Sequence, residues 1–221
     1  MRPVVLVLVA VICTALAEGV SVKSLVFPTA TSNSYVEMAP LKSLRLSAFT
    51  LCMRVATELQ DEREIIFFAY RTPDFDELNV WRELDGRLSF YLSGDGVLFQ
   101  LPQLGALQTH LCFSWDSKTG AANVFMNGKK SVTKIYKKGH IIRPGGRVIL
   151  GQDPDSFLGD FEEKQSFVGE IYDVNMWDSV LPDSTIQDVY AGRRFPRGNV
   201  FDWEATTLEV NGNVHVVSLE L

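Results

Sequence analysis

The chain has 221 residues, 46% of them hydrophobic, and a formal net charge of −6. That length suits one large domain with a buried core. Nonspecific nucleic-acid binding needs a basic surface, so the acidic balance argues against it and no nucleic-acid specificity is expected. The basic cluster Lys129–Lys138 is interpreted as a solvated strand face, with an anionic partner as the alternative.

The first residues have the parts of a secretory signal peptide. Arg2 is the positive start, Val4–Cys13 is an apolar run too short to span a bilayer comfortably, and Ala15–Ala17 has the small-x-small pattern of a cleavage site. We expect residues 1–17 to be removed, with a signal anchor as the alternative. Residues 18–221 contain no linker or repeat and are expected to form one secreted, extracellular domain.

Most of the remaining chain alternates apolar and polar residues, the pattern of strands with one buried face. Turn signals rich in Gly, Asn and Asp separate these segments. Many short strands at this spacing predict an all-β fold, an antiparallel two-sheet jelly-roll sandwich. The predicted strands are Phe49–Val55, Ile65–Tyr70, Leu78–Trp81, Leu88–Leu92, His110–Trp115, Asn123–Met126, Val148–Leu150, Phe167–Trp177 and Val214–Leu219.

One later segment departs from this alternation. Leu181–Gly192 has a Pro-Asp pair near its start and a glycine at its end, the usual boundaries of a helix. Its apolar residues recur at helical spacing, at Ile186, Val189 and Tyr190. The sequence therefore predicts one long helix that packs on a sheet through this face.

Two cysteines remain after the expected signal peptide. Because Cys52 and Cys112 form an even pair in a chain bound for an oxidising compartment, we expect a disulfide, with two buried free thiols as the alternative. The bond would close a loop of about sixty residues and contribute roughly 4 kcal/mol through the unfolded state.

The segment Gln152–Gln165 is dense in oxygen donors. It holds five carboxylates and two carboxamides beside one lysine, and carboxylates this crowded need a cation or full hydration. Calcium takes six to eight oxygen ligands, whereas a soft metal would require His or Cys, which this segment lacks. Asp153 and Asp155 flank Pro154, whose carbonyl can also bind. The composition predicts a cation site, with an acidic surface turn as the alternative.

The segment His110–Ser117 carries a specific motif. It reads His-Leu-Cys-Phe-Ser-Trp-Asp-Ser and matches the pentraxin signature His-x-Cys-x-Ser/Thr-Trp-x-Ser/Thr at every specified position. The sequence thus resembles the short pentraxins over essentially all of residues 18–221. Further segments that look like the family are Leu25–Pro28, Ala48–Cys52, Leu150–Gln152, Gln165–Ile171, Asn175–Asp178 and Phe201–Trp203.

The resemblance implies a concanavalin- and laminin-G-like jelly roll with one helix and a Cys52–Cys112 disulfide. It also implies a cyclic homo-oligomer, usually a pentamer, and two calcium ions per subunit that receive an anionic group of the ligand. The family's calcium ligands fall on Asp76, Asp153, Pro154, Asp155, Glu162 and Gln165. One more upstream ligand falls on Phe75 in an ungapped match, or on Asp74 if the loop is one residue shorter.

The resemblance also places a ligand pocket beside the calcium. The family's aromatic position is Trp81, a strong cation–π surface, and Tyr91 fills a second aromatic position. The family's acidic position falls on Gly96, with Asp95 next to it. The alternative is that Trp81 and Tyr91 are only cross-strand packing partners.

The implied function is calcium-dependent pattern recognition in innate immunity. The expected ligands are phosphocholine, phosphoethanolamine or related groups on microbial or damaged-cell surfaces, with complement components as partners on the opposite face. A laminin-G-like lectin that binds carbohydrate or protein is the alternative. Catalysis is not expected, because a spacing of three places Glu170 and Asp173 on opposite faces of a regular strand. His110 and Trp115 are interpreted as packing residues.

Overall fold

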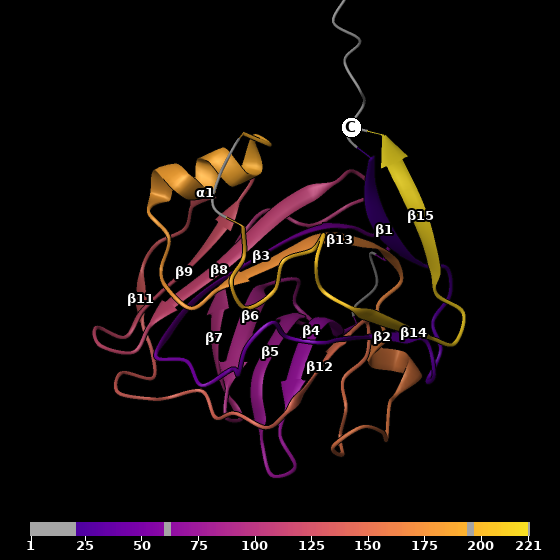
Figure 1. Ribbon diagram of the computed structural model, residues 1–221, viewed down its shortest axis with the longest axis horizontal. Helices are drawn as coiled ribbons and strands as arrows, with labels where there is room; N and C mark the ends of the chain where they lie inside the picture. Colours follow the sequence, from indigo (N-terminus) through magenta and orange to yellow (C-terminus); the bar gives the residue numbers. More distant parts are fainter. Residues whose placement is uncertain (1–20, 60–62, 194–196, 221) are drawn as a thin grey trace, which may run out of the picture.

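The computed structural model describes residues 21–59, 63–193 and 197–220, so the expected signal peptide lies outside the described residues. These residues form two antiparallel sheets that pack face to face, with one α-helix against the outer side of one sheet (Figure 1). The all-β sandwich with one helix, predicted from the alternation, is confirmed.

The first sheet has eight strands. Their order is β10 (Lys129–Lys130), β9 (Ala121–Met126), β8 (Thr109–Asp116), β3 (Ala48–Ala56), β13 (Gly169–Trp177), β1 (Ser21–Phe27) and β15 (His215–Glu220), with β11 (Lys134–Ile135) also paired to β9. The second sheet has seven, in the order β14 (Leu208–Asn211), β2 (Tyr35–Met38), β12 (Arg147–Leu150), β4 (Ile65–Arg71), β5 (Asp76–Arg82), β6 (Leu88–Leu92) and β7 (Asp95–Phe99).

Strand β3 shows how the alternation builds the core. Phe49, Leu51 and Met53 are completely buried between the sheets, whereas Cys52 and Arg54 lie on the outer face of the eight-stranded sheet. All nine predicted strands exist, but β1, β2, β7, β10, β11 and β14 were not predicted. Strand β7 was concealed by its turn signal, since only Ser93 and Gly94 form the turn, at φ 49° and 75°, and the strand already begins at Asp95.

Helix α1 (Asp183–Tyr190) lies on the outer face of the eight-stranded sheet (Figure 1). The predicted Cys52–Cys112 disulfide is confirmed, with an S–S distance of 2.04 Å, and the bond packs under the buried helix residues Ile186 and Val189. Tyr190, the last residue of the helix, is 41% exposed, but its ring still lies 5.7 Å from that of His110 on β8.

Strand β13 is not regular, which changes one argument from sequence. A β-bulge between Tyr172 and Asn175 inserts an extra residue, and Asp173 has a φ of +54° there. Asp173 accepts a hydrogen bond from Arg54 on the outer face, the face on which Glu170 also lies. The prediction that Glu170 and Asp173 lie on opposite faces was therefore wrong. Asp173 is instead held in an ion pair with Arg54.

Candidate functional site

The candidate site lies on the outer face of the seven-stranded sheet. A small apolar cluster covers this face, formed by Ile66, Ala69, Trp81 and Ile149 from strands β4, β5 and β12. The loop after β12 folds back over this cluster through Phe161, whose ring lies 4.9 Å from that of Tyr35. The acidic segment is therefore held against the sheet by the contact of its own Phe161 with Tyr35 of β2.

Asp153 lies near the start of this loop. Its side chain is buried, with 9% of the residue exposed, and Asn79 Nδ2 donates a hydrogen bond of 3.0 Å to its Oδ1. Burial, followed by the negative charges of Asp76 and Asp155, raises the pKa of Asp153 from 3.8 to about 7. Without a counter-charge, this carboxylate is therefore costly to ionise at neutral pH.

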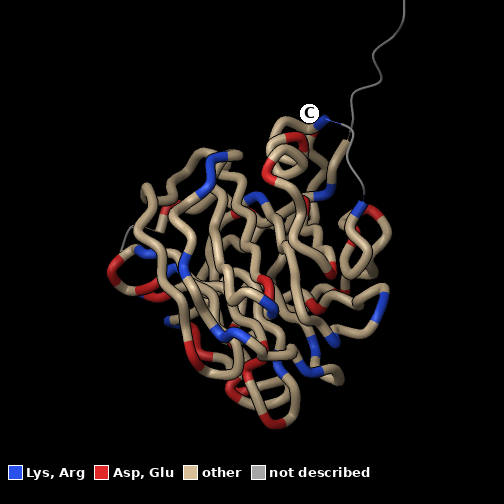
Figure 2. The backbone as a smooth tube through the Cα atoms, turned by 90° about the vertical axis from the view of Figure 1, so that its left-hand side faces the viewer, with Lys and Arg blue, Asp and Glu red and all other residues tan. Residues whose placement is uncertain are grey.

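The other predicted acids surround Asp153 but do not contact one another closely. Burial raises the pKa of Asp155, as does the nearby charge of Glu162. Asp76 forms an ion pair with Arg71, and Glu162 forms one with Lys164 at 2.8 Å. Figure 2 shows several acidic positions gathered in the loops at the lower end of the molecule. Single basic side chains thus neutralise individual carboxylates, while the charges of Asp76 and Glu162 raise the pKa of both Asp153 and Asp155.

Two amide oxygens complete the group. Asn79 Oδ1 and Gln165 Oε1 are buried, and neither has a hydrogen-bond partner among the described residues. A buried acceptor without a partner costs about 1–3 kcal/mol, so native structures rarely leave one without a purpose. Carboxylate and carboxamide oxygens are the donors that calcium prefers. The side chains present here therefore fit a hard divalent cation.

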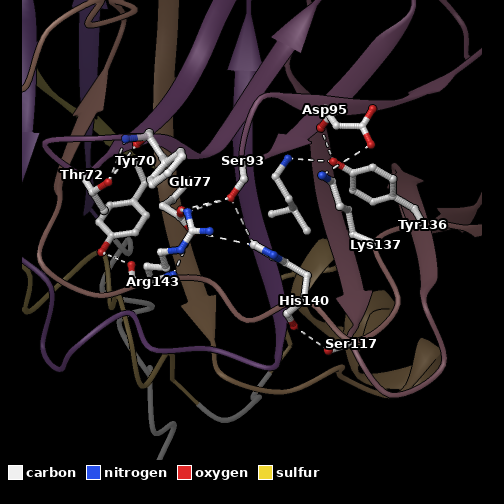
Figure 3. A network of polar contacts seen from close by, with 12 residues as sticks. Tyr70, Thr72, Glu77, Ser93, Asp95, Ser117, Tyr136, Lys137, His140 and Arg143 are labelled. Atoms are coloured by element: carbon white, nitrogen blue, oxygen red, sulfur yellow. Dashed lines mark hydrogen bonds and ion pairs between the residues drawn. The ribbon is translucent and has the colours of Figure 1, made fainter.

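The upstream segment holds the two alternative ligand positions, Asp74 and Phe75. Asp74 is exposed and does not line the cavity beside Asp153. The Phe75 ring lies 4.1 Å from the Arg143 guanidinium carbon, and Arg143 Nη1 donates a hydrogen bond of 2.7 Å to the fully buried carboxylate of Glu77 (Figure 3). The sequence interpretation missed this Glu77–Arg143 pair. It ties the start of β5, immediately after Asp76, to the loop that precedes β12.

A cavity of about 230 Å³ extends from the acidic loop along the sheet. Trp81 and Tyr91 both line it, as predicted for ligand contacts, and both also pack in the apolar cluster of this face. Trp81 pairs with Ser89 and Tyr91 with Asn79, so the two aromatic residues are not directly opposite partners. The full lining is Glu64, Asp76, Asn79, Trp81, Glu83, Tyr91, Gly94, Asp153 and Gln165.

Asp95 does not line this cavity. Its carboxylate lies 3.6 Å from Lys137 Nζ, and its backbone carbonyl accepts a hydrogen bond from the Tyr136 hydroxyl (Figure 3). The acids at this end of the cavity are Glu64 and Glu83, which were not predicted. A signal for Glu83 was present, since it follows Trp81 by two residues and so continues the same face of the strand.

One other group of metal-donor side chains exists among the described residues. Cys52, His110 and Cys112 bring donor atoms within 4.8 Å of one another. The two sulfurs are joined in the disulfide, so they are not thiolate ligands. Burial lowers the pKa of His110 to about 3, which keeps the imidazole neutral, as a packing residue requires. No helix in the described part of the chain is long and apolar enough to cross a membrane.

Comparison with known proteins agrees with this architecture. The chain is 55% identical to a C-reactive protein of Danio rerio over 204 residues, which cover 91% of each chain. It is 39% identical to the C-reactive protein of Homo sapiens, with 87% of this chain and 86% of the relative covered. The native heptameric SAP-like pentraxin of Limulus polyphemus has the same fold, with a TM-score of 0.77 at 24% identity, covering 88% of this chain and 94% of that chain. Because the Pentaxin family profile also matches residues 23–218, this chain belongs to the Pentaxin family.

Proposed function

We propose that this pentraxin is a secreted recognition protein that binds phosphate-bearing ligands through calcium. The observation that carries the proposal is the set of unpaired oxygens around Asp153. Asn79 Oδ1 and Gln165 Oε1 are buried without partners, next to a carboxylate whose pKa is raised to about 7. A divalent cation would satisfy the two amide oxygens and allow the carboxylate to ionise.

The arrangement of the predicted ligands supports this proposal. Asp153 and Gln165 line the cavity with Asp76, and the charges of Asp155 and Glu162 raise the pKa of Asp153. With the carbonyl of Pro154, these side chains supply enough oxygen donors for the two-ion site implied by the family. Bound calcium would supply the positive charge that phosphate oxygens need, and the protein side chains would hold and orient it.

The ligands we propose are phosphocholine, phosphoethanolamine or related groups on microbial or damaged-cell surfaces, recognised in innate immunity. The Limulus relative is described as heptameric, which supports assembly of this chain into a ring. A ring would present one site per subunit on a single face, so that weak sites would act together on a surface. Its opposite face is then the one expected to meet complement components.

The test is capture on a matrix that carries phosphoethanolamine or phosphocholine, at millimolar calcium, followed by elution with a chelator. Retention that requires calcium is expected on at least one phosphate matrix. Retention that ignores the chelator would contradict the calcium mechanism. Retention only on neutral sugars would favour the lectin alternative.

A further inference from the structure

Arg71 places a positive charge inside the group of acids around Asp153. It is the last residue of β4, directly opposite Asp76 in the ladder between β4 and β5, and its Nη1 donates a hydrogen bond to Asp76 Oδ1. The Arg71 side chain is only 16% exposed, compared with 36% for that of Asp76. The fold therefore fixes this cation beside Asp76 and does not leave it free in solvent.

The charge of Arg71 also acts on the loop that follows β12. It lowers the pKa of both Asp153 and Asp155, against burial and the neighbouring carboxylates, which raise it. Arg147 lies opposite Arg71 in the ladder between β4 and β12, but its guanidinium is held by Glu37 at 2.8 Å. Arg71 thus acts on three of the acids that are predicted to bind calcium.

The segment between β4 and β5 does not add a further carboxylate to this group. The turn after β4 is closed on itself, because Thr72 N donates a hydrogen bond of 2.9 Å to the Phe75 carbonyl and Phe75 N donates one of 3.1 Å to Thr72 Oγ1. Phe75 has no side-chain oxygen, and Asp74 is exposed away from the cavity. Asp76 does line the cavity, and it is the acid that Arg71 already holds.

The charges of this group match one calcium ion better than two. Four carboxylates are predicted to bind calcium: Asp76, Asp153, Asp155 and Glu162. Two calcium ions together with Arg71 would place five positive charges against these four negative ones, even with the exposed Lys164 turned away from Glu162. Like charges repel strongly where little water separates them, so the guanidinium would oppose a second ion at Asp76. The oxygen donors are numerous enough for two ions, but their negative charge is not.

We propose that Arg71 takes the place of one of the two calcium ions implied by the family, so that each subunit binds a single calcium ion. The acids of the loop after β12 hold that ion together with Gln165, and Arg71 holds Asp76 where the other ion would lie. Part of the positive charge at this face is then independent of the free calcium concentration. The inference rests on the proposed function, because it concerns the ions of the same site.

The experiment is equilibrium dialysis of the full-length protein against calcium, without any phosphate ligand, and with bound calcium measured by atomic emission. Wild-type protein should bind about one ion per subunit at a free calcium concentration of about 1 mM. Arg71→Met keeps the apolar part of the side chain but removes the charge, and it should bind about two ions. Arg71→Lys keeps the charge and should remain at about one ion.

A second measurement does not depend on counting ions. In chelator, limited proteolysis should cleave the loop after β12 at least about threefold faster in Arg71→Met than in wild type, because the loop acids then repel one another without their fixed cation. Calcium should remove this difference. Equal cleavage of the two proteins in chelator would show that Arg71 does not neutralise the loop acids, which would overturn the inference.

Arg193→Met is the matched control for both measurements. Arg193 also forms an ion pair with an aspartate, Asp188 at 2.7 Å, but it follows helix α1 on the other face, so this variant should behave as wild type. The inference is overturned if wild-type protein binds two ions per subunit, if Arg71→Met stays at one, or if Arg71→Lys gains a second. A wild-type protein that binds no calcium at all would instead contradict the proposed function, and the inference with it.

Discussion

Each outer face of the sandwich holds an aspartate, buried at Asp153 and half-buried at Asp173, and the two faces treat it differently. Under helix α1, Asp173 accepts hydrogen bonds from Arg54 at 3.1 Å and from Asn175 at 2.7 Å. On the other face, Asp153 accepts one from Asn79, whose own Oδ1 has no partner in the described structure. Burial raises the pKa of both carboxyls. Arg54 opposes the shift at Asp173 through its charge and a hydrogen bond, whereas Arg71 opposes the shift at Asp153 through its charge alone.

This difference marks Asp173 as a structural polar residue and Asp153 as part of a candidate binding site. On the helix side, Arg54 and Asn175 satisfy the carboxylate of the half-buried Asp173, so this residue gains nothing from a ligand. The loop-side face leaves the Asp153 carboxylate without enough opposing charge and the amide oxygens of Asn79 and Gln165 without partners. A bound cation can supply what these groups lack. Four predictions test this difference between the two faces.

The largest effect is expected from removing a cation ligand on the loop side. Asp155→Ala or Glu162→Ala should reduce capture on phosphate matrices by at least about 100-fold, since loss even of an outer supporting partner costs 10–100-fold. Size-exclusion chromatography should show an unchanged oligomer. Asp160→Asn, in the same loop, is the control and should still be captured. Capture of the two alanine variants at micromolar calcium would contradict the assignment.

On the helix side, removal of the partner should cost stability and leave binding unaffected. Arg54→Ala leaves the half-buried Asp173 without its cation and should lower the free energy of unfolding by about 3 kcal/mol, the lower end of the cost for a buried pair, measured in urea. The exposed Arg45 provides the control, because Arg45→Ala should change stability by less than about 0.5 kcal/mol. Equal losses in both variants would show that Asp173 does not depend on Arg54.

On the loop side, neutralising the buried Asp153 should raise the free energy of unfolding rather than lower it. In chelator at pH 8, Asp153→Asn should be more stable than wild type, by at most about 4 kcal/mol, because a shift of about three pKa units no longer opposes folding. The advantage should disappear below pH 4, where the wild-type carboxyl is protonated in both the folded and unfolded states. Calcium should stabilise wild type but not the variant. A variant less stable than wild type in chelator at pH 8 would contradict this account.

The smallest effect concerns His110 under the helix. Its folded pKa of about 3 lies below the ordinary value of 6.5, so its contribution to stability is complete above pH 6.5 and is lost as the pH falls towards 3. Between pH 6 and 4, the stability difference between wild type and His110→Gln should shrink by about 1.4 kcal/mol per pH unit. Urea titrations at several pH values measure it. A constant difference would mean that His110 titrates normally.

Much of the fold could be predicted because it depends on local pattern. The alternation along Phe49–Val55 and the helical spacing of Ile186 and Val189 specify which residues are buried, whatever the rest of the chain does. The missed strands show the limit of this reasoning. Strand β7 begins with Asp95 and Gly96, which read locally as a turn, and only pairing with β6 makes them part of a sheet.

The bulge at Asp173 shows the same limit within a correctly predicted strand. An added residue in β13 is visible only against β3, where two residues face one, and it reversed the predicted relation of Glu170 and Asp173. Likewise, Asp95 and Glu83 are both acids near the pocket in sequence. Which one lines the cavity depends on Tyr136 and Lys137, which hold Asp95 elsewhere.

The sequence by itself determined that this protein is a β-sandwich with one disulfide, one helix and an acidic loop rich in calcium-type donors. Burial patterns, cysteine pairing and donor chemistry are properties of residue type and spacing. Only the tertiary structure decided that Asn79 supports Asp153, that Glu83 rather than Asp95 lines the cavity, and that Arg143 and Glu77 hold the start of β5. These relations join residues far apart in the chain, so they arise only when the loops fold over the sheet.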